Sequence, residues 1–183
     1  TASDASPADG NRGLRDANDS IAVAAGAAAR LSVTAPADIT VGGTRATYTV
    51  TRRDSQDNVA SPSSEQTVVY LFANGTSGTF YDALTGGGSI TQVTIPSGAA
   101  SASFYFTATT AAAYTVTVSD SPTADGATGL VDANDSIAVA AGAAARLSLT
   151  PPQDDITVGV ARATYTVTLR DSHNNLTAAA RNQ

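Results

Sequence analysis

The chain of 183 residues contains no cysteine, lysine, methionine or tryptophan. Without cysteine it can form no disulfide, and without lysine it can form no Lys–Asn isopeptide cross-link. Positive charge is also scarce, because ten arginines face sixteen acidic residues and the net charge is −6. This balance argues against nucleic acid or an anionic membrane as a partner. No run of about 18 apolar residues occurs, so we expect no membrane span in this sequence.

What the sequence does contain is a long internal repeat. Residues 16–32 read DANDSIAVAAGAAARLS, and residues 132–148 read the same seventeen letters 116 positions later. Residues 45–51 (RATYTVT) return as residues 162–168, and the triplet Arg-Asp-Ser follows in both copies. A period of this length is the size of one ordinary domain and is too long for a solenoid repeat. The repeat therefore predicts an array of whole domains in tandem.

The position of the repeat within the array predicts the domain boundaries. The equivalent glycines Gly26 and Gly142 lie where one domain ends and the next begins. Residues 1–26 are then the C-terminal strand of a preceding domain, residues 27–142 are one complete domain, and residues 143–183 are the N-terminal strands of the next. The junctions consist of two or three small residues without proline, which favours stiff joints.

Strand patterns dominate the chain. Residues 45–52, 101–107 and 113–119 alternate apolar with hydroxyl-bearing side chains, which is typical of half-buried antiparallel strands. Seven to nine short strands in one repeat predict an all-β fold, a two-sheet β-sandwich. We predict strands at residues 29–34, 38–42, 45–53, 66–73, 79–82, 89–95, 100–107, 113–119 and 136–141. The same alternation predicts a core that includes Leu31, Val50, Phe72, Phe104, Val116 and Val139.

Two segments resemble a known family. Residues 30–54 have an apolar opening strand and a long alternating strand that ends in Asp before a polar turn containing Asn, and residues 111–118 have a late strand with Tyr114. These segments resemble the bacterial immunoglobulin-like repeats of invasin and intimin type, although Ala112 stands where that family usually has Gly. The resemblance implies an immunoglobulin-like antiparallel sandwich in which Tyr114 makes a tyrosine corner. It also implies a large extracellular or cell-surface protein, such as an adhesin or a fibre.

An acidic loop at residues 120–135 is the candidate site. Aspartate and asparagine oxygens are ligands that calcium takes, six to eight at a time. In an immunoglobulin-like sandwich this loop shares one pole with the loop at residues 54–64, so the two could form one calcium site. The predicted ligands are Asp120, Asp125, Asp132, Asn134, Asp135, Asp54 and Asp57. The alternative is that these residues form solvated turns, since no EF-hand spacing is present.

Catalysis is not expected. His173 is the single histidine of the chain, and residues 27–142 contain none. No Ser/His/Asp set or cysteine nucleophile can therefore be built inside the complete domain.

The sequence predicts a structural repeat of a long extracellular bacterial protein, which is an adhesin stalk, a surface layer or a filament subunit. The incomplete pieces at the two ends predict that neighbouring copies complete them by strand pairing, head to tail. The alternative is an immunoglobulin-like adhesion module that binds a glycan or a protein. Exposed aromatic side chains in the loops of one pole would favour that alternative.

Overall fold

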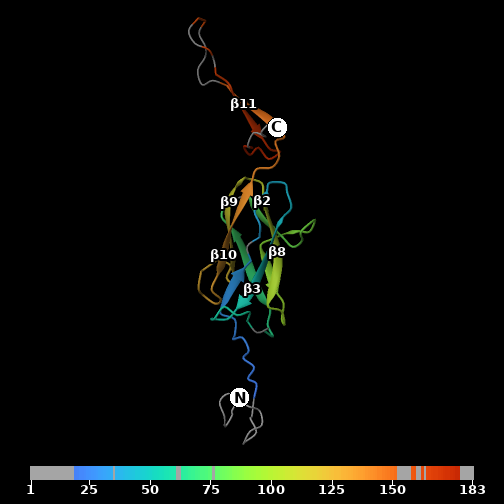
Figure 1. The fold of residues 1–183 in the computed structure, drawn as a ribbon, viewed down its shortest axis with the longest axis vertical. Coiled ribbons are helices and arrows are strands. Elements are labelled where there is room, and N and C mark those ends of the chain that lie inside the picture. The colour runs from blue at the N-terminus through green and yellow to red at the C-terminus, as the bar shows by residue number, and fades with distance from the viewer. Residues whose placement is uncertain are drawn as a thin grey trace, which may run out of the picture.

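The computed structural model describes residues 19–34, 36–60, 63–75, 77–151, 158–159, 162 and 164–177. These residues form twelve strands in three sheets and no helix. Two five-stranded sheets form a sandwich between residues 30 and 140, and a two-stranded sheet lies beyond it (Figure 1). Accordingly, no helix that could cross a membrane is found in the described ranges. The prediction of an all-β sandwich is therefore confirmed.

The first sheet has the order β1-β3-β8-β5-β6. Its strands are β1 (Arg30–Val33), β3 (Ala46–Arg53), β8 (Ser101–Ala108), β5 (Gly78–Tyr81) and β6 (Ser89–Ile90). All neighbours in it are antiparallel. Along β3, Ala46, Tyr48 and Val50 are buried while Thr47 is exposed, as the two-residue period of a half-buried strand requires.

The second sheet has the order β2-β10-β9-β4-β7. Its strands are β2 (Ile39–Thr40), β10 (Ala133–Ala140), β9 (Ala112–Ser119), β4 (Thr67–Ala73) and β7 (Gln92–Ile95). Only β2 and β10 pair in parallel within this sheet. Residues 29–31 also exchange backbone hydrogen bonds with Val131, so the start of β1 contacts the segment that leads into β10.

The core lies between the two sheets and contains side chains from most of their strands. Tyr48 stacks on Phe104 with ring centroids 5.2 Å apart, and Phe80 meets the edge of the same ring. The predicted core is confirmed for five residues, which are Leu31, Val50, Phe104, Val116 and Val139. The prediction for Phe72 is wrong: β4 buries Val69 and Leu71, so the alternation places Phe72 on the outer face.

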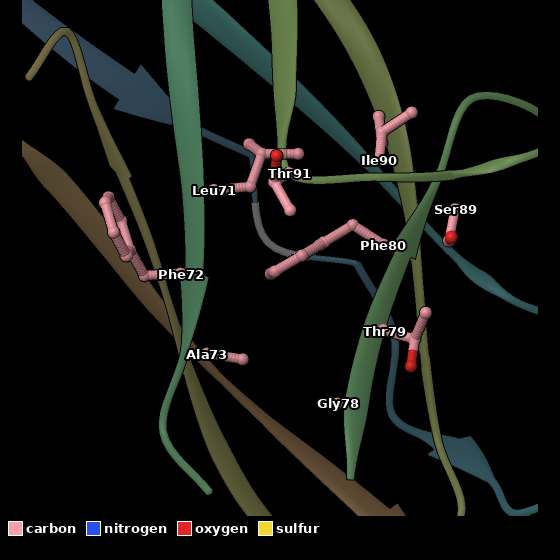
Figure 2. Close-up of a pocket in the computed structure, with 9 residues that line it drawn as sticks. All are labelled: Leu71, Phe72, Ala73, Gly78, Thr79, Phe80, Ser89, Ile90 and Thr91. Atoms are coloured by element: carbon pink, nitrogen blue, oxygen red, sulfur yellow. The ribbon is translucent and has the colours of Figure 1, made fainter. Parts of the chain in front are cut away.

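The predicted strand at residues 89–95 is divided at Thr91. β6 pairs with β5 in the first sheet, whereas β7 pairs with β4 in the second. The chain therefore crosses from one sheet to the other at this point. A pocket of about 450 Å³ opens beside the crossing, and Figure 2 shows Leu71 and Phe80 pointing toward each other across it while Phe72 points away.

The third sheet consists of β11 (Arg146–Thr150) and β12 (Thr166–Arg170), which pair in antiparallel register. It lies at the end of the sandwich opposite to the end where residues 19–28 arrive (Figure 1). We call the arrival end the N-terminal pole and the other end the C-terminal pole. The predicted boundaries at Gly26 and Gly142 stay predictions, and parts of the segments 1–26 and 143–183 lie outside the described residues.

Candidate functional site

A tight loop follows β3 at the N-terminal pole. We call residues 54–59 the first aspartate loop, because the buried Asp54 carboxylate organises it. Its Oδ1 accepts the backbone N–H groups of Gln56 (3.0 Å) and Asn58 (2.9 Å), and the Asn58 amide also donates to it. Its Oδ2 accepts the N–H of Gly26 at 2.9 Å. One carboxylate therefore fixes the loop and fastens the incoming chain to it.

The same arrangement occurs after β12 at the C-terminal pole. Residues 171–176 form the second aspartate loop, in which the buried Asp171 accepts the N–H groups of His173 and Asn175, both at 2.9 Å. It also accepts the N–H of Gly142 at 3.0 Å and the Asn175 side-chain amide at 2.8 Å. The two loops thus share four contacts from equivalent positions of the repeated sequence, and in the first loop the Asn58 amide also reaches the second carboxylate oxygen.

The loops also share their backbone shape. Asp57 in the first loop has φ of 68°, and Asn174 at the equivalent position of the second has φ of 72°. Aspartate and asparagine tolerate this left-handed region better than most residues, because their short polar side chains bond locally. The positive φ turns the chain so that Asn58 and Asn175 each point their amide back at the carboxylate.

Hydrogen bonding keeps both carboxylates ionised. The backbone hydrogen bond from Gly26 is the largest cause that lowers the pKa of Asp54, and Asn58 adds to it. For Asp171, burial acts to raise the pKa, but hydrogen bonds from Asn175, Gly142 and His173 outweigh it and lower the pKa to about 2. A charged acceptor makes each of these hydrogen bonds stronger than a neutral one would be.

The second aspartate loop also contacts the sandwich itself. The Asn175 amide donates to the carbonyl of Thr109 at 3.0 Å, and its Oδ1 accepts the N–H of Ala111 at 3.0 Å. Both partners lie in the turn between β8 and β9. Nearby, a Cβ at Gly142 would lie 2.8 Å from the Val41 carbonyl oxygen, so only glycine fits this approach. The two-stranded sheet is therefore held against the C-terminal pole by side-chain and backbone contacts.

The first aspartate loop lacks this second layer of contact. Asn58 is exposed, whereas Asn175 is half-buried. In the described part of the chain, the Asn58 side chain forms hydrogen bonds with Asp54 alone. A Cβ at Gly26 would come no closer than 3.4 Å to its nearest neighbour, which is Asp54.

The predicted calcium ligands are mostly bonded within their own loops. Asp120 accepts the N–H of Leu130 (3.0 Å), Asp125 that of Thr128 (3.2 Å), and Asp132 that of Gly126 (2.8 Å). Turn formation, the alternative interpretation, accounts for these contacts. Two buried oxygens, Oδ1 of Asp120 and of Asp132, accept no hydrogen bond from the described residues.

Asn134 and Asp135, at the end of the predicted loop, belong to β10, and Asp57 lies in the first aspartate loop. The Asp135 carboxylate accepts a hydrogen bond from the Tyr48 hydroxyl at 3.2 Å, and Asn134 lies opposite Thr117. The Oδ1 atom of Asp57 is 3.8 Å from the Nε atom of Arg53. Across the described ranges, no three acidic or histidine side chains gather as a metal site would require. Calcium binding stays a prediction.

Of the predicted ligands, Asp120 lines a pocket at the N-terminal pole, and Asp54 binds Gly26 of the same lining. Asp120, Gly26 and the buried Arg52 line one pocket of about 630 Å³ at the N-terminal pole. The polar head of Arg52 is held by the Ala99 carbonyl and the Thr67 hydroxyl. His173, the single histidine, is exposed, and its ring contacts the Ser172 hydroxyl.

Sequence reasoning missed the role of the two asparagines. It treated Asp54 as a metal ligand, whereas the structure uses its oxygens for five hydrogen bonds within the loop and its junction. A signal was present, because both copies place Asn four residues after the Asp of the Arg-Asp-Ser triplet.

Comparison with known proteins adds no relative. No protein-family model matches the chain, and no curated protein matches it. What defines its class is the fold, an all-β sandwich of two five-stranded sheets with an aspartate loop at each pole. Its function has to be argued from that geometry.

Proposed function

We propose that this chain is a segment of a rod built from tandem immunoglobulin-like β-sandwiches. The rod would belong to a long extracellular bacterial protein, as an adhesin stalk, a surface layer or a filament subunit. The function is mechanical, because each sandwich sets the position and angle of the next. One observation carries the proposal: the same aspartate loop fastens the chain at the entrance of the sandwich and again at its exit.

The strand order supports the immunoglobulin-like class. The orders β1-β3-β8-β5 and β10-β9-β4 correspond to the ABED and GFC sheets of seven-stranded immunoglobulin sandwiches. In addition, the buried Tyr114 donates its hydroxyl to the carbonyl of Thr110 at 3.0 Å. This is the contact of a tyrosine corner, and it lies near the start of the strand that corresponds to F.

The path of the chain supports a rod. The chain enters the sandwich at one pole and leaves it at the other, and the molecule is elongated along that direction (Figure 1). Only residues 141–145 connect β10 with β11. A connection this short, fastened by Asp171 and Asn175, leaves little freedom of angle between the two bodies.

The exposed apolar side chains at the ends support completion by neighbours. Ile137 and Val139 are buried in β10, whereas the equivalent Ile21 and Val23 are 87% and 92% exposed. In the rod, strands of an adjoining sandwich or of a second copy would cover them by strand pairing. The contact runs head to tail and so propagates along one direction.

The alternative function is ligand binding at the N-terminal pole. The pocket beside Gly26 favours it, because Arg52 and Asp120 place charged groups of opposite sign on its lining. A glycan or a peptide is the chemistry that such a pocket would take. Immobilised chain tested against glycans and host proteins would detect this activity, and Asp120→Ala should abolish it.

A chain with residues 27–142 duplicated in place tests the rod. In small-angle X-ray scattering, we expect the maximum dimension to grow by one sandwich length, with the profile of a stiff rod. As a control, a flexible Gly/Ser insertion after Gly142 should keep the length but broaden the distance distribution. Two sandwiches packed side by side would contradict the proposal.

A further inference from the structure

The two aspartate loops have the same internal structure but different surroundings. The second loop rests on the turn between β8 and β9, where Asn175 binds Thr109 and Ala111. The first loop presents Asn58 to solvent at the N-terminal pole. Because each asparagine bonds the aspartate of its own loop in the same way, the two side chains are already held in equivalent orientations.

We propose that the first aspartate loop, residues 54–59, is a docking surface for a second copy of this sandwich that precedes it in the array. Asn58 binds the backbone of that copy's β8–β9 turn, as Asn175 binds Thr109 and Ala111 here. This inference rests on the proposed rod, and it names the contact that orients each sandwich on the one before it.

The chemistry of the contact explains how one loop can serve every joint of an array. A side-chain amide has two donor hydrogens and one acceptor oxygen. In Asn175, the nitrogen donates to both Asp171 and Thr109, and the oxygen accepts from Ala111. The groups recognised on the sandwich are a carbonyl and an N–H of the main chain. The contact therefore depends on the fold of the turn and tolerates changes in its side chains.

Gly26 supplies an independent observation. Gly142 is required by the close approach of the Val41 carbonyl of the preceding sandwich. Nothing comparable approaches Gly26, and its φ lies outside the left-handed region. Within the described residues, no close contact therefore requires a glycine at position 26. A preceding sandwich, docked as the two-stranded sheet is docked here, would bring the equivalent of the Val41 carbonyl against Gly26.

The test uses the chain with residues 27–142 duplicated, and its readout is amide hydrogen exchange at Ala111 of the first sandwich. Asn58→Ala is introduced only in the second sandwich. We expect exchange at that Ala111 to accelerate about tenfold, because its acceptor is lost. Asn175→Ala should do the same to Ala111 of the second sandwich.

The same Asn58→Ala in the 183-residue chain is the matched control. It removes the same bonds to Asp54 but has no preceding sandwich to release, so Ala111 should stay protected by Asn175. A melting curve of this control shows whether the sandwich folds without the Asn58 amide. If it does not, Asn58→Ser in the second sandwich replaces Asn58→Ala, because its hydroxyl can still donate to Asp54 but is too short to reach the preceding turn; Ala111 of the first sandwich should then exchange faster than in the parent duplicated chain.

The outcomes separate the inference from the rod. If scattering shows an extended chain and Ala111 of the first sandwich is insensitive to Asn58, the docking surface is refuted while the rod stands. If scattering shows sandwiches packed side by side, the rod itself is refuted. Accelerated exchange in an extended chain supports both.

Discussion

Equivalent residues of the internal repeat lie in the sandwich and in the C-terminal two-stranded sheet, but their surroundings differ. Leu31, Tyr48 and Val50 are 3%, 0% and 0% exposed in the sandwich. Their equivalents in the two-stranded sheet, which are Leu147, Tyr165 and Val167, are 70%, 56% and 60% exposed. Both pairs of strands nevertheless have the same register, with Leu31 opposite Arg52 and Leu147 opposite Leu169.

This comparison separates what is local from what is collective. The strand register and the aspartate loop form in both places, because their hydrogen bonds join residues of one hairpin and its junction. Among the described residues, these apolar side chains are buried only in the sandwich, because their burial requires side chains from β4, β8 and β9 that residues 143–183 do not contain. Two strands without such cover are marginally stable in water.

The largest effect is expected from removing an aromatic side chain that only the sandwich has. Phe104→Ala should destabilise the sandwich by about 3–5 kcal/mol, because it leaves a cavity beside Tyr48 and Phe80. Phe72→Ala, on the outer face, should cost less than about 1.5 kcal/mol. Urea unfolding monitored by circular dichroism measures both free energies of unfolding. Equal losses would show that Phe72 lies in the core and not on the outer face of β4.

The next largest effect compares equivalent leucines. Leu31→Ala should lower the free energy of unfolding by about 2–5 kcal/mol, because Leu31 is buried in the core. Leu147→Ala should change it by less than about 0.5 kcal/mol, because most of its side chain is in solvent. The same urea titration measures the pair. A large cost for Leu147 in this chain would mean that the two-stranded sheet has its own core.

A smaller effect is expected from the aspartates. Asp54→Ala leaves the N–H groups of Gly26, Gln56 and Asn58 without their acceptor, which should lower the stability of the sandwich by less than Leu31→Ala does, because water can replace the acceptor at these exposed residues. Asp171→Ala should leave the melting temperature of the sandwich unchanged and instead release Gly142. Hydrogen exchange at Gly142 and Asn175 measures the effect of Asp171→Ala. If both variants lower the melting temperature of the sandwich equally, Asp171 supports the sandwich itself and not only the junction at Gly142.

Acid should weaken both loops together. The pKa of each carboxyl is lower in the folded chain than the ordinary value near 3.9, so the unfolded state binds more protons as the pH falls. The stability that they contribute is complete above about pH 4, and for Asp171 it is lost as the pH falls toward 2. Between pH 7 and pH 2, the melting temperature should fall less for Asp54→Asn than for the parent chain. An equal fall of the melting temperature in both chains would show that the Asp54 carboxylate does not contribute to this pH dependence.

Strand positions could be predicted because alternation is a property of a few neighbouring residues. In β3 the apolar residues of the predicted alternation over residues 45–52, which are Ala46, Tyr48 and Val50, are all buried. Phe72 was misplaced because β4 is apolar on both faces, so its sequence VVYLF does not say which parity points inward. The break at Thr91 was also missed, since the alternation does not record which sheet each half of the segment joins.

The candidate site was harder to predict than the fold. Asp54 and Asp120 were predicted as calcium ligands from their side-chain chemistry, but in the structure their oxygens accept hydrogen bonds from backbone N–H groups that no side-chain pattern reveals. The contact of Asn175 with Ala111 joins residues 64 apart through a main-chain N–H. Composition and spacing do not predict such a contact. The repeated Arg-Asp-Ser triplet predicts only the position of the loop that makes it.

One measurement tests most directly whether β11 and β12 begin a second sandwich. A chain in which residues 1–176 are followed by residues 60–142 supplies the strands that this sheet lacks. We expect Leu147, Tyr165 and Val167 to become buried, with amide protection in β11 and β12 rising to the level of β1 and β3 in the same exchange experiment. If these amides exchange as fast as in the 183-residue chain, β11 and β12 are not the start of a repeated sandwich.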